Sequence, residues 1–364
     1  MEHTLSGRRF LGAVGVVVLV TGLFGAWIGL DIGGARVTLW VDDGLTPLAA
    51  LIACVLCFRA RARHCGRMRL FWSLLACAAA SWTFAEVVWG YYALVLNVEV
   101  PVPSWADVGY LSAIPLTVAA LVVHPGTSGS GTRKARWVSD GLVVATALLF
   151  ISWELVLGPL WRSADLSTWT GVVALAYPFG DVVIVFFIVL AIRGMSGADR
   201  LSLWCLLAAL LVMALSDSTF SYLTEVAKYT SGDLIDTGWV AAYLGIALAA
   251  FSSQSGSVVM ARAEQSRPSL VALISPLLPV LLALSVAAVE IRLGHHLDRA
   301  AWLMVFGLIA LVLVRQGLMV LELLAHSRDT QAGLMQRLTN AALGGAGAGD
   351  GPGSGHQAGG YEPL

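Results

Sequence analysis

The sequence has little charge of either sign. Only 12% of its 364 residues are Asp, Glu, Lys or Arg, against about 25% in soluble domains, whereas 58% are hydrophobic. The 22 basic and 23 acidic residues nearly cancel, so the chain lacks the basic excess that marks proteins that bind nucleic acid. The mean hydropathy of +0.79 instead predicts an integral membrane protein whose main partner is the lipid bilayer.

The sequence also lacks the motifs of common enzyme active sites. It contains no G-x-S-x-G or H-E-x-x-H segment, and the glycine-rich segment 126–134 lacks the G-K-[ST] ending of a phosphate loop. Cys54 and Cys57 form a C-x-x-C pair inside an apolar run, which favours packing residues over the alternative of a redox or metal pair. We therefore expect no enzyme activity, no catalytic residue, no cofactor and no metal site.

Long apolar runs dominate the sequence. A helix that crosses a hydrocarbon core of about 30 Å needs about 20 mostly apolar residues. Ten runs approach or exceed this length and predict an all-α polytopic membrane protein of five helical hairpins. The predicted spans are residues 10–30, 44–58, 70–95, 105–123, 138–160, 172–192, 201–223, 238–252, 269–289 and 299–315.

Basic residues between the runs predict the orientation. Seventeen of the 22 fall in the termini or in every second connection, which the positive-inside rule assigns to the cytoplasm. We expect both termini to be cytoplasmic and the protein to lie in the cell membrane. Fifteen of the 23 acidic residues then fall in the outer half, which would attract cations or amines or would titrate when the outside acidifies.

Carboxylates within the runs point to a site, because an ionisable group at membrane depth is costly and marks a pathway, a ligand or a paired charge. Glu86, Glu154 and Asp217 each lie 16 residues past the start of an outgoing run, about 24 Å up from the cytoplasmic side. The returning runs also carry acids near their outer ends. Together with neighbouring tyrosines, the predicted ligand-binding set is Glu86, Asp107, Glu154, Tyr177, Asp181, Asp217, Tyr222 and Asp236.

Two other interpretations of these acids remain open. Asp43, Asp107, Asp236 and Asp298 precede or begin returning runs, where Asp is a favoured helix cap. The deeper acids could instead form hydrogen bonds between helices. The best internal match in the sequence aligns 86–121 with 217–249, so that Asp107-Val-Gly-Tyr110 falls on Asp236-Thr-Gly-Trp239 and predicts a repeated hairpin.

Four segments resemble a known family of signalling proteins. They are Trp89-x-Tyr91-Tyr92, Pro101-x-Pro103-Ser104-x-Ala106-Asp107-x-x-Tyr110, Ala176-Tyr177-Pro178-x-Gly180-Asp181, and Asp217 with Tyr222. Residues 1–325 are similar to the multi-span sensory region that precedes diguanylate cyclase (GGDEF) and phosphodiesterase (EAL) domains in actinobacterial proteins. In that family the last span continues into a cytoplasmic connector helix, but here no catalytic domain follows it. The resemblance implies an input module that signals through a partner.

The sequence thus predicts three parts: a membrane domain (1–315), a cytoplasmic connector helix (316–343) and a disordered glycine-rich tail (344–364). Apolar residues at helical spacing in the connector would allow a homodimer through a short coiled coil, or binding along the membrane surface. We expect a sensory module that binds a small ligand or protons at the outer acidic and aromatic site and signals to a cytoplasmic partner. The alternatives are a transporter of a cation or small amine and a structural membrane protein without a ligand.

Overall fold

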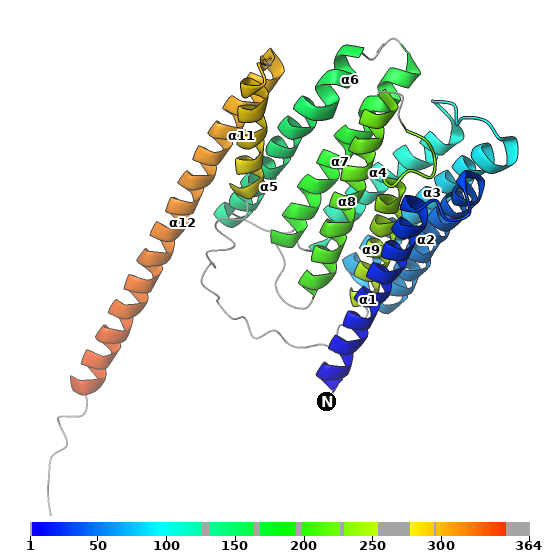
Figure 1. The fold of residues 1–364 in the computed structure, drawn as a ribbon. Coiled ribbons are helices and arrows are strands. Elements are labelled where there is room, and N and C mark those ends of the chain that lie inside the picture. The colour runs from blue at the N-terminus through cyan, green and yellow to red at the C-terminus, as the bar shows by residue number, and fades with distance from the viewer. Residues whose placement is uncertain are drawn as a thin grey trace, which may run out of the picture. The chain divides into compact units, whose positions relative to one another are not determined.

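The computed structural model describes residues 2–125, 131–163, 168–193, 199–225, 229–253, 277–294 and 296–346. Every regular element in these ranges is helical (Figure 1), which confirms the all-α prediction. The elements are α1 (Glu2–Gly29), α2 (Ala35–Arg63), α3 (Gly66–Gly90), η1 (Tyr91–Leu96), α4 (Trp105–Val123), α5 (Gly131–Ser152), η3 (Trp153–Leu157), α6 (Gly158–Ser163), α7 (Trp169–Arg193), α8 (Asp199–Glu225), α9 (Asp236–Ser253), α11 (Leu277–Arg292) and α12 (Arg299–Ala346).

Eight helical segments within these ranges are long and apolar enough to cross a membrane. They correspond to eight of the ten predicted spans. The other two predicted spans coincide with α9 and with α11, whose described parts are 18 and 16 residues long. Residues 269–276 of the predicted ninth span lie outside the described residues.

Helix α4 begins and ends where the sequence predicts. Ser104 precedes its first turn, and its hydroxyl accepts a hydrogen bond from the Ala106 amide at 3.2 Å. The Asp107 carboxylate in turn accepts the Ser104 amide at 2.7 Å, which completes a capping box. The Asp107 carboxylate therefore caps the helix from its first turn, while Ser104 occupies the N-cap position itself.

Helix α2 begins nine residues before the predicted span. The prediction that Asp43 caps this helix is wrong, because both Asp42 and Asp43 lie inside it and are buried. The helix continues through Asp42 and Asp43 because apolar residues precede and follow the pair. The two carboxylates lower the local hydropathy of the sequence, so the predicted span began after them. Because burial of a carboxyl group at membrane depth is costly, we expect both side chains to face a polar space inside the protein.

Six helices form a closed ring. In the order α2, α3, α4, α7, α8, α9 each helix packs on the next, and α9 packs on α2. α1 lies against α9 outside the ring: the Gly25 backbone approaches Thr237 closely. α5 packs on α7, and an apolar cluster joins α5 with α11 and the first part of α12 through Phe150, Ala287 and Leu308.

One end of the ring is filled by apolar side chains. Each of the six helices contributes at least one completely buried residue there; these residues, here called the apolar layer, are Cys57, Leu75, Leu121, Ile188, Leu206 and Ile246. They lie toward the end where α2 turns into α3, and hydrogen bonds from Arg67 to the Val123 carbonyl and from Ser202 to the Ala249 carbonyl join neighbouring helices at this end. The apolar layer closes the interior of the ring at this end.

The described chain divides into two units, residues 1–315 and residues from 316 onward. Within α12 the helix continues without a break from Arg299 to Ala346, so the predicted connector is helical along its whole length. Residues 347–364 of the predicted tail lie outside the described residues.

Candidate functional site

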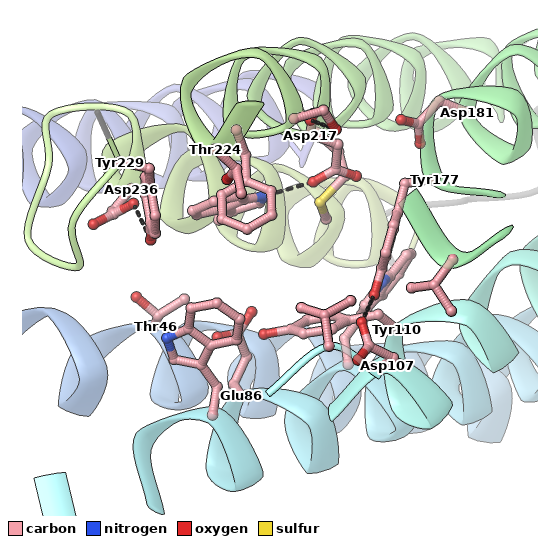
Figure 2. A pocket seen from close by; sticks show the side chains of 18 of the residues that line it. Thr46, Glu86, Asp107, Tyr110, Tyr177, Asp181, Asp217, Thr224, Tyr229 and Asp236 are labelled. Atoms are coloured by element: carbon pink, nitrogen blue, oxygen red, sulfur yellow. Dashed lines mark hydrogen bonds between the residues drawn. The ribbon is translucent and has the colours of Figure 1, made fainter. Parts of the chain in front are cut away.

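A cavity of about 270 Å³ lies inside the six-helix ring. All six ring helices line it, and its described lining includes seven carboxyl side chains and no Lys, Arg or His. The seven acids are Asp42, Asp43, Glu86, Asp107, Asp181, Asp217 and Asp236. Figure 2 shows five of them facing one interior, from helices that lie far apart in the sequence. Such a surface attracts positive charge and disfavours anions.

One face of α9 connects acids from three helices. Asp236, Trp239 and Tyr243 follow at helical spacing, so their side chains project from the same side. Trp239 donates a hydrogen bond of 2.7 Å from its indole nitrogen to Asp217 Oδ1 on α8, and Tyr243 donates one of 2.7 Å from its hydroxyl to Glu86 Oε1 on α3. The steps along α9 therefore place these acids at successive depths in the cavity.

Asp236 itself is joined to α2. The Gly232 amide donates to both Asp42 Oδ2 (2.9 Å) and Asp236 Oδ2 (2.8 Å), so one backbone amide brings the two carboxyl groups together. Tyr229, in the loop before α9, donates to Asp236 Oδ1 at 3.1 Å. Burial and the neighbouring Asp236 carboxyl raise the pKa of the Tyr229 hydroxyl, so it remains a donor.

A second group of polar contacts lies across the cavity. The Tyr177 hydroxyl on α7 donates a hydrogen bond of 2.6 Å to Asp107 Oδ1, visible in Figure 2, while the other Asp107 oxygen caps α4. Tyr110, one turn along α4, hydrogen-bonds Glu86. Asp107 thus caps its helix and also fixes a tyrosine inside the cavity, so the capping and ligand-site interpretations of this residue are compatible.

Two carboxyl oxygens in the cavity are left over. Asp43 Oδ2 and Asp181 Oδ2 are both buried and have no hydrogen-bond partner among the described residues. Asp43 is only 9% exposed. A buried carboxyl oxygen without a partner is costly, in the range of a few kcal/mol. Both oxygens are enclosed by neighbouring atoms, and a group that reached them would satisfy an acceptor that is otherwise unpaired.

Aromatic rings complete the wall. Eight of the described lining residues are aromatic, among them Trp82, Trp89 and Phe220. No group of three or more His, Cys, Asp or Glu side chains in the described residues converges closely enough to hold a metal ion. Carboxylates that are spread around a chamber walled by aromatic rings suit an organic cation, which gains both charge pairing and cation–π contact.

The structure brings six of the eight predicted site residues together: Glu86, Asp107, Tyr177, Asp181, Asp217 and Asp236 all line the cavity. It does not bring Glu154 or Tyr222 there. Glu154 lies on η3, outside the ring, near Asp298 and Glu290. Tyr222 on α8 is 53% exposed and faces away from the cavity. Glu154 lies as far along its apolar run as Glu86 and Asp217 do, but that position does not specify which side of a helix faces the ring.

Sequence reasoning also missed lining residues. Asp42 was not selected because it precedes the predicted span. Tyr243 was not selected because a single tyrosine within an apolar run does not indicate a site. The spacing of Tyr243 seven residues after Asp236, two helical turns along one face, was the available clue. Comparison of the chain with family models, with curated proteins and with solved structures gives no match.

Proposed function

We propose that this protein is a membrane signal-input module that binds a small cation in the cavity of its six-helix ring. The observation that supports this most is the lining itself: seven carboxyl groups, eight aromatic rings and no basic side chain among the described residues around one cavity. Protons are the simplest cation the site could take, and an organic amine is the ligand that uses both the carboxyls and the rings.

A buried ion pair supports the signalling part of the proposal. Arg315, the last residue of the first unit, donates a hydrogen bond of 2.6 Å to Asp140 within α5, and α5 packs on the ring helix α7. The connector begins with the next residue of α12. A shift of α7 on ligand binding would therefore reach the root of the connector through α5 and this pair.

The apolar layer favours a receptor over a carrier. Completely buried side chains such as Leu75, Leu121 and Ile246 fill the ring on the side away from the acids, so the polar surface does not continue across the protein. A receptor needs access from one side only, whereas a carrier needs a polar route that opens alternately to both.

The test of this proposal is the melting temperature of the purified full chain in detergent with ammonium, n-butylamine, choline and putrescine, and across pH. A ligand that binds only the folded state stabilises it by about 2.7 kcal/mol at a hundred times its Kd. We expect stabilisation in the wild type and its loss in Glu86→Gln/Asp217→Asn. The control variant is Glu99→Gln, which removes an exposed acid outside the cavity. Equal responses of all three proteins would contradict the proposal and favour a purely structural protein.

A transporter of a cation or small amine is the second candidate, because the ring contains a repeated arrangement. In α4 and in α9 an acid in the first turn is followed by a glycine and then by an aromatic residue that hydrogen-bonds an acid of the preceding helix: Tyr110 bonds Glu86, and Trp239 bonds Asp217. Internal repeats of this kind are common in carriers. Uptake of labelled putrescine into proteoliposomes would favour transport, and binding without uptake would favour the receptor.

Topology and partners belong to the same proposal. Ten crossings in five hairpins with both termini in the cytoplasm of the cell would place the connector next to a cytoplasmic signalling protein or a second copy of this chain. The resemblance to sensory regions that precede GGDEF and EAL domains supports this arrangement. Crosslinking through single cysteines introduced in 316–343 tests the homodimer.

A further inference from the structure

The six-helix ring consists of two sets of three helices with equivalent contacts: α2, α3 and α4 form one set, and α7, α8 and α9 form the other. In each set the third helix packs on the second through a glycine, since a methyl group on Gly109 would touch Ala85 and one on Gly238 would touch Ser216. Each of those neighbours directly precedes the cavity-lining acid of its helix, Glu86 or Asp217. The two sets are therefore related by an approximate twofold repeat around the cavity.

The two carboxyl oxygens without partners occupy matching places in this repeat. Asp43 lies on α2, the first helix of one set, and Asp181 lies on α7, the first helix of the other. In the closed ring these two helices are separated by two helices in either direction, so they stand opposite each other. The five remaining acids of the cavity all have hydrogen-bond donors from the protein: tyrosine or serine hydroxyls, indole nitrogens or backbone amides.

The two free oxygens lie at different ends of the chamber. Asp43 is adjacent to Asp42, whose carboxyl group accepts hydrogen bonds from the Thr46 hydroxyl and from the Gly232 amide, which also bonds Asp236. Figure 2 shows Thr46 and Asp236 at one end of the cavity and Asp181 with Tyr177 at the other. Aromatic and aliphatic side chains, such as Trp82, Trp239 and Met213, line the cavity as well. The cavity thus offers two carboxyl oxygens without partners, and the lining between them combines aromatic and aliphatic side chains with the hydrogen-bonded acids Glu86 and Asp217.

We propose that the ligand of this site is a linear diamine whose two ammonium groups bind Asp43 and Asp181 while its methylene chain lies between the aromatic walls. This inference rests on the proposed cation-binding function and specifies its ligand class. Each ammonium would supply donors to a buried carboxyl oxygen that otherwise has none. A monoamine would satisfy only one of the two, and a metal ion would not contact both.

The experiment compares putrescine and cadaverine with n-butylamine and n-pentylamine by isothermal titration of the purified full chain at constant ionic strength. A hydrogen bond to a charged group contributes about 1.5–3 kcal/mol, so the better diamine should bind about ten- to a hundredfold more tightly than the monoamine of equal length. We expect one diamine per chain. Asp43→Asn and Asp181→Asn should each reduce diamine affinity to that of the monoamine, and Glu99→Gln should leave it unchanged.

Two results would overturn the inference. Equal affinity for diamines and monoamines would show that only one carboxyl takes part, and would leave the cation-binding function intact. Diamine binding that survives both Asp43→Asn and Asp181→Asn would place the ammonium groups elsewhere. Because neither Oδ2 atom has a protein partner to lose, the melting temperatures of these variants without ligand should stay close to that of the wild type, which separates a lost site from a lost fold.

Discussion

Arg315 and Asp140 form a hydrogen-bonded ion pair of 2.6 Å whose side chains are only 3% and 4% exposed. The pair joins α12 to α5 immediately before the connector. Removal of one partner from a buried pair leaves an uncompensated charge and costs about 3–5 kcal/mol. We therefore expect Arg315→Met to lower the melting temperature strongly and Arg315→Met/Asp140→Leu to recover much of it. The exposed pair of Arg162 and Asp298 is the control.

That control pair measures 3.3 Å with side chains 60% and 38% exposed, so Arg162→Met should cost no more than about 1 kcal/mol. A large loss for Arg162→Met, or none for Arg315→Met, would contradict the assignment of the buried pair as the link at the root of the connector.

Tyr243→Phe tests the link between α9 and Glu86. The substitution keeps the ring but removes the 2.7 Å hydrogen bond, and it should reduce stability by about 1–3 kcal/mol while Tyr110 still bonds the carboxyl. Tyr222→Phe removes the hydroxyl of an exposed tyrosine and should have no measurable effect. Thermal unfolding of both variants gives the comparison, and equal effects would refute a specific role of Tyr243.

Gly109→Ala should destabilise the packing of α4 on α3. The added methyl carbon would lie 2.8 Å from the Ala85 methyl and 2.9 Å from the Ser81 carbonyl oxygen, which is backbone and cannot move freely. We expect a loss of about 1–3 kcal/mol. Gly44→Ala in α2 meets nothing within 4 Å and should be neutral or stabilising. A neutral Gly109→Ala in the melting assay would argue against this close contact.

His124 predicts a pH dependence of stability. It follows the last residue of α4, is 1% exposed and packs edge-on against Phe71 at 4.8 Å. Burial and the nearby Arg67 charge lower the pKa of His124 to about 4. Because the folded pKa is below that of the unfolded chain, stability is complete above about pH 6.5 and falls as the pH decreases toward 4, by about 3 kcal/mol in total.

The corresponding variant is His124→Gln, which cannot titrate. The wild type should lose stability relative to this variant between pH 6.5 and 4, and the two melting curves should run parallel above that interval. Parallel curves over the whole range would show that His124 does not protonate on unfolding.

The bounds of α4 were predictable because Ser104 and Asp107 give a local capping signal, whereas the start of α2 was not, because two carboxylates interrupt an apolar helix that tertiary structure stabilises. The position of an acid within an apolar run was sufficient to select Glu86, Asp181 and Asp217. It could not separate them from Glu154, since helix rotation depends on neighbours distant in sequence. The hydrogen-bond partners of these acids, such as Tyr243, could not be predicted from the sequence because they depend on how α9 packs against α3 and α8.

The most direct test of the central claim is equilibrium binding of radiolabelled putrescine to the purified full chain and to Asp43→Asn/Asp181→Asn. The account predicts saturable binding of one molecule per wild-type chain and no saturable binding to the double variant, with both proteins folded. Binding that is absent in the wild type, or equal in the two proteins, would contradict a diamine site formed by Asp43 and Asp181 in the six-helix ring.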